Sequence, residues 1–422
     1  MLFLYKFLSV FLYPIITIVI ILRKFLKKED PVRFKEKIFY NSFSPRKNKL
    51  DKLIWFHAAS IGEMLSIIPI IEEWSKKNNQ LKFLITTVTL SSGKLFEKKF
   101  FEQKNILHRY FPIDCHFIVK KFLKSWRPSM VIFVDSEIWP NFLTEIKLKK
   151  IPLVLLNGRI TEKSFKKWLY LKNFAKKIFS NFDLCLSSSL KSSSYLEKLG
   201  VNNIKFFGNL KFSVYQKKTL LDNQNSTYLK NSNTWLAAST HEGEEEICIK
   251  THFEIKKKYN NVITIIAPRH INRVEDISNL ASRYNLKTQI LKPLQMIDRN
   301  KELIIVDSFG ELSGYYQCCK SVFMGKSILQ KLKSTSGQNP IEAAKLGCRI
   351  YSGPFVNNFK EIYKYLEELN ISKKVENYKE LSQDVIKDLN EVKKEDIEKI
   401  NVIQEFGEEI KNKTVKELNN FL

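Results

Sequence analysis

The stretch HAASIGE, residues 57–63, places a carboxylate where an apolar run ends and a second apolar run begins. The preceding KLIWF is typical of a buried strand, and the following MLSIIPIIEEW is typical of a helix with one apolar face. The ordinary explanation is that the helix dipole stabilises a negative charge in the first helical turn, by roughly 0.3–1 kcal/mol. Glu63 would also lie at the carboxyl end of a strand, however, where open α/β sheets bind their ligands.

Polar side chains follow three further predicted strands in the first half of the chain, within VDSEIWPN, LNGRI and FGNLKF. Singly, each has an ordinary explanation, such as a solvated surface position. Because the carboxyl ends of parallel strands meet at one edge of a sheet, together they predict a shared site. The residues are Asp135, Ser136, Glu137, Asn157, Arg159, Asn209 and Lys211.

The second half repeats this arrangement in AASTHEGEEE, IAPRH, DSFGELSGYY and GQNPIEAAKLG. Ser and Thr before a helix are common N-caps, and GQNPIEA is a good helix start in its own right. Backbone amides at helix starts also bind phosphate, and a neighbouring carboxylate can hold ribose hydroxyls, so a nucleotide-sugar donor fits. The candidate residues are Ser239, Thr240, His241, Arg269, His270, Glu311 and Glu342.

The elements that would position these residues alternate between apolar, β-rich runs and amphipathic helical runs from residue 52 onward. Continuously apolar strands between helices predict parallel sheets covered on both faces. The pattern pauses in the polar stretch 216–233, which we interpret as an interdomain linker between two doubly wound, Rossmann-like halves. The chain has no GxGxxG and no GxxxxGK[ST], so neither a dinucleotide dehydrogenase nor a P-loop enzyme is supported.

The composition is that of a folded protein, with 422 residues, 44% hydrophobic and 27% charged. A net charge of +26 indicates an anionic partner, such as nucleic acid, an acidic membrane surface or a phosphorylated substrate, although abundant Lys, Asn, Ile and Phe could also reflect a genome-wide bias. The six cysteines form no CxxC pair and no zinc spacing, which predicts buried thiols in a reducing compartment and no metal centre.

Residues 7–22 carry no charge and are followed by Arg23, Lys24, Lys27 and Lys28. This pattern predicts an uncleaved N-terminal membrane-anchor helix whose following domain stays in the cytoplasm. A cleaved signal peptide is disfavoured, because the basic cluster comes after the apolar run and no small-residue cleavage site follows. A helix lying in the membrane interface or on the protein remains an alternative.

The motifs HAASIGE, EIWPN, NGRITEKS, GNLKF, AASTHEGEE, PRH, GEL and GQNPIEAAKLGC…SGPFVNNFKEI occur in one order along the chain. As a set they resemble the bacterial 3-deoxy-D-manno-octulosonic acid (Kdo) transferases, the lipid IVA Kdo transferase family. The resemblance covers nearly the whole chain, including the N-terminal segment. No single motif is specific, but the ordered set is.

The resemblance implies an α/β GT-B glycosyltransferase with an anchor over 1–28, an acceptor-binding Rossmann-like domain over 29–215, a linker over 216–233 and a CMP-Kdo-binding domain over 234–422, whose last helix can pack back on the first domain. Such an enzyme moves Kdo from CMP-Kdo to a lipid A precursor with inversion, needs no metal or cofactor, and works at the cytoplasmic face of the inner membrane. It implies no nucleic-acid partner, and the sequence predicts no oligomeric state.

Residue roles follow from the matching motifs. Glu63 is the implied general base, and Glu137 and Lys211 are implied to stabilise the transition state and the charged donor, with Asp135 a weaker candidate for that task. A base near a helix start has its pKa pushed down, so burial must offset this effect near neutral pH. The implied CMP contacts are Pro268, Arg269, Phe309, Gly310, Glu311, Asn339, Pro340, Ile341 and Glu342.

Two departures from the family pattern lie beside the implied CMP site. The usual glycine pair in GGS is GKS here, with Lys326, and GGHN is SGQN, with Ser336 and Gln338. Another membrane-associated GT-B enzyme, such as a lipid-linked N-acetylglucosaminyl transferase or a nucleotide-sugar epimerase, is the main alternative. A non-enzymatic protein that binds nucleic acid or membrane ranks last. Such a protein would carry its basic residues on one continuous face, whereas here they are scattered through the predicted helices.

Overall fold

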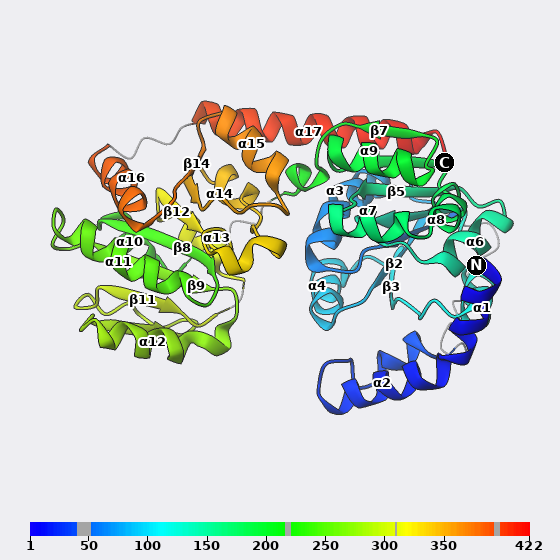
Figure 1. The fold of residues 1–422 in the computed structure, drawn as a ribbon, viewed down its shortest axis with the longest axis horizontal. Helices are drawn as coiled ribbons and strands as arrows, with labels where there is room; N and C mark the ends of the chain where they lie inside the picture. Colours follow the sequence, from blue (N-terminus) through cyan, green and yellow to red (C-terminus); the bar gives the residue numbers. More distant parts are fainter. Residues whose placement is uncertain (40–51, 216–220, 309, 392–396) are drawn as a thin grey trace. The chain divides into compact units, whose positions relative to one another are not determined.

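The computed structural model describes residues 1–39, 52–215, 221–308, 310–391 and 397–422. The chain divides into two compact units. Unit 1 comprises Met1–Val214 and Phe406–Leu422, and unit 2 comprises Tyr215–Glu405. Each unit is built on a seven-stranded sheet of parallel strands with helices packed on it (Figure 1). The predicted α/β class with two Rossmann-like halves is therefore confirmed.

Unit 1 has the strand order β3-β2-β1-β4-β5-β6-β7. Its strands are β1 Lys52–His57, β2 Leu81–Thr87, β3 Ile106–Tyr110, β4 Met130–Val134, β5 Leu153–Gly158, β6 Leu184–Ser187 and β7 Ile204–Phe206. Its helices are α1 Leu2–Phe11, α2 Tyr13–Phe25, η1 Arg33–Lys37, α3 Ile61–Lys77, α4 Leu90–Phe100, α5 His116–Trp126, α6 Pro140–Leu148, α7 Glu162–Leu169, α8 Lys172–Phe179, α9 Leu190–Leu199 and η3 Leu210–Ser213. Because β2 and β3 lie on one side of β1 and β4 on the other, the winding direction reverses between β1 and β4.

An aromatic cluster fills the core of unit 1 around Trp55 on β1. The Trp55 ring lies 4.9 Å from the Phe122 ring and 5.4 Å from the rings of Phe133 and Phe142, measured between centroids, and all four are fully buried. Burying one such side chain stabilises the fold by about 1.5–3 kcal/mol. The apolar runs that predicted β1 and β4 thus supply the core that holds the sheet, and the loops after these strands are fixed to it.

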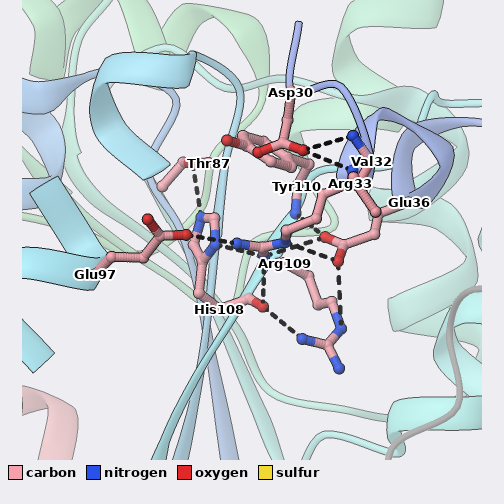
Figure 2. A network of polar contacts seen from close by, with 9 residues as sticks. All are labelled: Asp30, Val32, Arg33, Glu36, Thr87, Glu97, His108, Arg109 and Tyr110. Carbon is pink, nitrogen blue, oxygen red and sulfur yellow. Dashed lines mark hydrogen bonds and ion pairs between the residues drawn. The ribbon is translucent and has the colours of Figure 1, made fainter. Parts of the chain in front are cut away.

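The segment that follows α2 is fastened to β3 by a polar network (Figure 2). Arg33 of η1 donates to the backbone oxygen of His108 (3.0 Å) and lies beside the carboxylate of Glu36, which accepts from the backbone N of Tyr110 at 2.8 Å. The neighbouring Lys37 forms an ion pair with Glu29, both largely buried. Strand β3 was not predicted, because its polar His108 and Arg109 interrupt the apolar pattern. Both have a partner in η1: Arg33 lies 2.7 Å from Nδ1 of His108, and Glu36 lies 4.0 Å from Nε of Arg109.

The N-terminal segment, predicted to form one membrane-anchor helix, folds as two helices. α1 and α2 meet at Leu12 at an angle of 51°, because Pro14 at the start of α2 has no N–H to donate to the preceding turn. No single helix in the described ranges has the length and apolar character to cross a membrane, whereas this bent pair together meets that criterion. Both helices pack against the rest of unit 1: Tyr5 donates to Asp114 (2.8 Å), and Ile20 is buried against Phe34 and Ile38.

Unit 2 has the strand order β10-β11-β9-β8-β12-β13-β14, and its winding reverses between β8 and β12. Its strands are β8 Thr234–Thr240, β9 Ile263–Pro268, β10 Thr288–Leu291, β11 Leu303–Val306, β12 Ser321–Met324, β13 Arg349–Ser352 and β14 Ser372–Lys374. Its helices are α10 Asn223–Lys230, α11 Glu244–Lys256, η4 Ile271–Arg273, α12 Val274–Arg283, α13 Leu312–Tyr316, η5 Gln330–Thr335, α14 Ile341–Lys345, α15 Lys360–Glu368 and α16 Tyr378–Asn390.

The stretch 216–233, predicted as an irregular linker, contains the helix α10 and belongs to unit 2. Asp222 caps this helix by accepting from the backbone N of Gln224, and Leu229 is fully buried, which explains why a polar sequence is ordered here. Residues 216–220 lie outside the described residues. The last helix, α17 Ile397–Asn419, belongs to unit 1 from Phe406 onward, where Trp74 of α3 donates to Asn419 at 2.9 Å.

Candidate active site

The edge of unit 1 where the winding reverses carries the predicted acidic residues. Glu63 follows β1, whereas Asp135 and Glu137 follow β4, and β1 and β4 are paired neighbours. The three carboxylates are close enough that the charges of Asp135 and Glu137 both act on Glu63. The structure therefore brings together side chains that the sequence places at two separate strand ends, at the position where open α/β sheets bind ligands.

Glu63 is held by the start of its own helix. Its Oε2 accepts from the backbone N of Ala59 (2.8 Å), and its Oε1 accepts from the hydroxyl of Ser60 (2.7 Å). Ser60 is also the N-cap of α3 and accepts from the backbone N of Glu63, so the two residues resemble a capping box in which the acid binds the backbone N of Ala59 in place of that of the N-cap. Burial, together with the negative charges of Asp135 and Glu137, nevertheless raises the pKa of Glu63 to about 7. Burial thus offsets the effect of the helix start, as the role of a base near neutral pH requires.

Glu137 has a different environment. Its Oε2 lies 3.0 Å from Nε2 of His57 and accepts from the indole N–H of Trp139 at 2.8 Å. Burial would raise the pKa of Glu137, but the hydrogen bond and charge of His57 and the hydrogen bond of Trp139 outweigh burial and leave this pKa below its ordinary value. Glu137 is therefore a carboxylate near neutral pH, while Glu63 titrates there.

Asp135 is paired with the candidate cation. Its Oδ2 lies 3.6 Å from Nζ of Lys211, and its side chain is almost entirely buried. Lys211 is on η3, and its position depends on two asparagines: Asn209 accepts from the backbone N of Lys211 (3.0 Å), and the buried Asn157 accepts from the backbone N of Leu210 (2.9 Å). Asn157 thus positions the loop that carries Lys211, which we call the lysine loop.

The C-terminal helix packs against the same loop. The rings of Phe406 and Phe212 lie 5.2 Å apart, edge to face, and a Cβ on Gly407 would come within 2.2 Å of the backbone oxygen of Phe212. Gly208 has a φ of +118°, and a Cβ at this position would come within 2.5 Å of the side chain of Ile410. Only glycine permits this approach, so α17 fixes the backbone on either side of Lys211.

His57 is the residue that sequence reasoning missed at this edge. It opens the motif HAASIGE, but nothing in the sequence near it indicates that its ring would contact a carboxylate from another strand. The contact with Glu137 joins residues 80 apart in sequence, and it forms because β1 pairs with β4.

The corresponding edge of unit 2 carries the predicted donor-binding residues. Pro268 ends β9, and the exposed Arg269 donates its backbone N–H to the Thr240 oxygen at the end of β8 (3.1 Å). Gly310 has a φ of +86° and precedes Glu311, which accepts from the hydroxyl of Ser308 at 2.6 Å. Phe309 lies outside the described residues.

The start of α14 contains four further candidates. Asn339 accepts from the backbone N of Ile341 (3.2 Å), Pro340 begins the helix, and burial raises the pKa of Glu342. The side chain of Ile341 is buried in the core, and the implied contact of Ile341 with CMP stays a prediction. Its apolar side chain packs inward as a helix requires, so only its backbone can face a ligand.

Comparison with known proteins decides the family. The profile of the family described as 3-Deoxy-D-manno-octulosonic-acid transferase (kdotransferase) matches residues 32–214. A 3-deoxy-D-manno-octulosonic acid transferase of Rickettsia bellii is 33% identical over 86% of this chain and 84% of its own length. The chain belongs to the Kdo transferase family. It is a glycosyltransferase that uses Kdo.

Kdo transferases from more distant bacteria are similar too: that of Haemophilus influenzae is 27% identical over 75% of this chain and 74% of its own length. A UDP-GlcNAc 2-epimerase from Neisseria meningitidis has the same fold, with a TM-score of 0.55 over 88% of this chain and 100% of its own, but only 12% identity. This likeness shows the fold alone, and the Kdo transferase sequence match disfavours the epimerase alternative.

The first departure from the Kdo transferase pattern, Lys326, occupies a loop that unit 2 holds firmly. Its φ is +59°, and its backbone N–H donates to the buried carboxylate of Glu244 at 2.6 Å. Glu244 also accepts from the backbone N of Ser327 at 2.8 Å. Glycine would adopt this left-handed backbone conformation freely. Lys326 also adopts it, because the carboxylate of Glu244 at the start of α11 fixes the loop.

The second departure lies around Ser336 and Gln338. The buried Ser336 donates to the backbone oxygen of Lys333 (2.9 Å) and accepts from the backbone N of Asn357 (3.2 Å). The backbone oxygen of Gln338 accepts from the hydroxyl of Tyr363 at 3.2 Å. Ser336 therefore has a structural role in this Kdo transferase, which glycine at that position could not supply.

Within the described ranges, no three His, Cys, Asp or Glu side chains gather as metal ligands would. All six cysteines are free and buried, as predicted. Burial raises the pKa of Cys185 and of Cys348 well above the ordinary thiol value, so these thiols are inert packing groups.

Proposed function

We propose that this Kdo transferase moves Kdo from CMP-Kdo to a hydroxyl of a lipid A precursor, lipid IVA, with inversion and without a metal. Glu63 takes the proton of the acceptor hydroxyl, and the oxygen forms a bond to the anomeric carbon of Kdo. The bond from that carbon to the phosphate oxygen breaks, and CMP leaves with the electron pair. Attack from the face opposite the leaving group inverts the anomeric centre.

The observation that carries this proposal is the environment of Glu63. Its pKa of about 7 lets it accept a proton near neutral pH, while its hydrogen bonds to Ala59 and Ser60 hold it in one orientation. Neighbouring acids with separated protonation behaviour are the usual sign of an acid–base site. Glu137 and Lys211 then contribute fixed charges that stabilise the transition state, and Asp135 forms the ion pair with Lys211.

We assign the donor to unit 2. Arg269 is exposed at the end of β9, and Gly310 and Asn339 offer backbone amides in the loops before α13 and α14. Glu311 and Glu342 are the carboxylates for the ribose hydroxyls, as part of the same CMP site. The nucleotide class, the lipid acceptor and metal independence are parts of this proposal.

A transfer assay tests the proposal. Purified full-length protein would receive freshly prepared, metal-free CMP-Kdo and a tetraacylated lipid A precursor in the presence of EDTA, with products read by mass spectrometry. Mass increments of whole Kdo units are expected, and they would also count the sugars added. A parallel reaction with UDP-N-acetylglucosamine tests the main alternative. An unchanged lipid with CMP-Kdo still present would overturn the donor or acceptor assignment, and activity only after adding Mg²⁺ would overturn metal independence.

We further propose that α1 and α2 attach the enzyme to the cytoplasmic face of the inner membrane. The two helices expose many large apolar side chains, and basic residues follow them. The most exposed are Met1, Phe3, Phe7, Phe11, Ile15, Ile18, Leu22 and Phe25, and the basic residues are Arg23, Lys24, Lys27 and Lys28. An exposed apolar face beside cations suits an anionic lipid surface.

Replacing Phe7 and Phe11 together by aspartate is expected to reduce vesicle binding at least tenfold. Both side chains are more than half exposed, so their loss leaves the core intact, while each would contribute about 1.5–3 kcal/mol if buried in lipid. Flotation with vesicles containing phosphatidylglycerol measures the effect. Phe101→Asp is the matched control, because Phe101 is 89% exposed elsewhere on unit 1. Equal flotation of all three proteins would contradict the proposal.

A further inference from the structure

His57 lies in a fully buried position with acceptors on both sides of its ring. Its Nδ1 is 3.0 Å from the hydroxyl oxygen of Thr86 and 3.2 Å from the backbone oxygen of Thr86. The hydroxyl of Thr86 donates its single hydrogen to the backbone oxygen of Phe56 and accepts from the indole of Trp55. The backbone oxygen of Thr86 can only accept, so its position beside Nδ1 favours a hydrogen on that nitrogen.

The other ring nitrogen faces an acid. Nε2 lies 3.0 Å from Oε2 of Glu137, and that oxygen already accepts from Trp139. A neutral ring with its hydrogen on Nδ1 would direct a lone pair at this carboxylate, which is unfavourable. The ring of Phe111 stacks on His57 with centroids 3.6 Å apart, and an aromatic face favours a cationic partner. Glu137 is the one acid among the described residues that contacts the ring.

We propose that His57 is a positioning residue that carries hydrogens on both ring nitrogens and holds Glu137 as an oriented carboxylate. Both donors bind the same oxygen, Oε2, so that Oε1 of Glu137 remains available at the edge of the sheet. The pair also completes a charge pattern. His57 is the partner of Glu137, and Lys211 is the partner of Asp135. The hydrogen-bond partners of Glu63 in the described part of the chain, Ala59 and Ser60, are uncharged, which leaves Glu63 to exchange a proton. The catalytic part of this inference rests on the proposed function.

Unit 2 provides an internal control. His252 is also fully buried, and its Nδ1 is 2.9 Å from the hydroxyl of Thr264, which accepts from the indole of Trp235. Within the described ranges, Nε2 of His252 has no hydrogen-bond partner, so no carboxylate there binds this ring, although the charge of Glu302 acts on it. Burial lowers the pKa of His252 to about 4. Each histidine thus contacts a threonine that accepts from a tryptophan, but only His57 also has a carboxylate at its Nε2.

Nitrogen NMR of the full-length protein labelled with ¹⁵N-histidine tests the proton count near pH 7.5. We expect both nitrogens of His57 to show protonated shifts, and His252 to show one protonated and one bare nitrogen. Signals are assigned by the loss of one set in His57→Asn and in His252→Asn. In Glu137→Gln, Nε2 of His57 should lose its hydrogen. A bare Nε2 on His57 in the wild-type protein overturns the inference, whether or not the enzyme transfers Kdo.

Transfer rates test the positioning role separately. If His57 acts through Glu137, the double variant His57→Asn/Glu137→Gln should be no slower than the slower single variant, since two residues that act as a unit are not additive. Multiplied losses in the double variant would overturn the positioning role. Circular dichroism of each variant would check that the fold is kept. A wild-type enzyme that fails to transfer Kdo would refute the proposed function instead, and the nitrogen shifts would still decide the state of His57.

Discussion

Replacing Glu63 by glutamine is expected to lower the rate of Kdo transfer by about 10²–10⁴-fold, the usual contribution of a general base. Glutamine keeps the size of the side chain and can still accept from the backbone N of Ala59, but it cannot take a proton. The rate of the wild-type enzyme should fall as pH drops through about 7, because protonation of Glu63 removes the base. Initial rates measured across pH, with saturating substrates, would show this acidic limb.

Glu162→Gln is the matched control for this experiment. Glu162 is also an acid in the first turn of a unit 1 helix, but it is exposed and paired with Lys166 and Lys191. Its replacement should leave both the rate and the pH profile unchanged. If Glu63→Gln is as active as Glu162→Gln, Glu63 is only a helix-capping acid and the base lies elsewhere.

Thermal unfolding gives an independent reading of the same group. The native state raises the pKa of Glu63 to about 7, so it binds this proton more tightly than the unfolded chain does. The free energy of unfolding should therefore fall as pH rises from about 4.5 to about 7. Glu63→Gln removes this loss and is expected to show a weaker pH dependence of the melting temperature.

Replacing Gly407 by alanine is expected to slow transfer at least tenfold. The added Cβ would lie 2.2 Å from the backbone oxygen of Phe212, a contact that neither backbone can accommodate without moving. The displaced loop carries Lys211, which pairs with Asp135, and a misplacement of about 1 Å in a catalytic group can cost as much as 10²-fold. Overpacking should also lower the free energy of unfolding by about 1–3 kcal/mol.

Gly62→Ala provides the stability control. Gly62 is in α3, and a Cβ at this position would meet nothing within 4 Å. Alanine there should raise the free energy of unfolding by up to about 1 kcal/mol through its better helix propensity. Denaturant unfolding measures both variants. Gly407→Ala with wild-type stability and rate would show that α17 tolerates a wider spacing and does not hold the lysine loop.

The sequence by itself determined the class of fold and the residue types at the site. Apolar strands alternating with amphipathic helices predicted parallel sheets, and the acids following β1 and β4 could be found because parallel strands bring their carboxyl ends to one edge. The burial of all six cysteines was also predicted, because they form no CxxC pair and several lie in predicted strands or helices. These features depend on local periodicity and on the order of elements, both of which are visible in a sequence.

Only the tertiary structure decided which charges pair. His57 reaches Glu137 because β1 lies beside β4, Lys211 reaches Asp135 because η3 follows the last strand of unit 1, and no local pattern encodes either contact. The stretch around α10 is polar by composition, yet it forms a helix, because the burial of Leu229 stabilises α10. A sequence shows what each residue can do. The pKa of Glu63 instead depends on burial and on two charges from another strand end, so packing gives this acid its proposed chemistry.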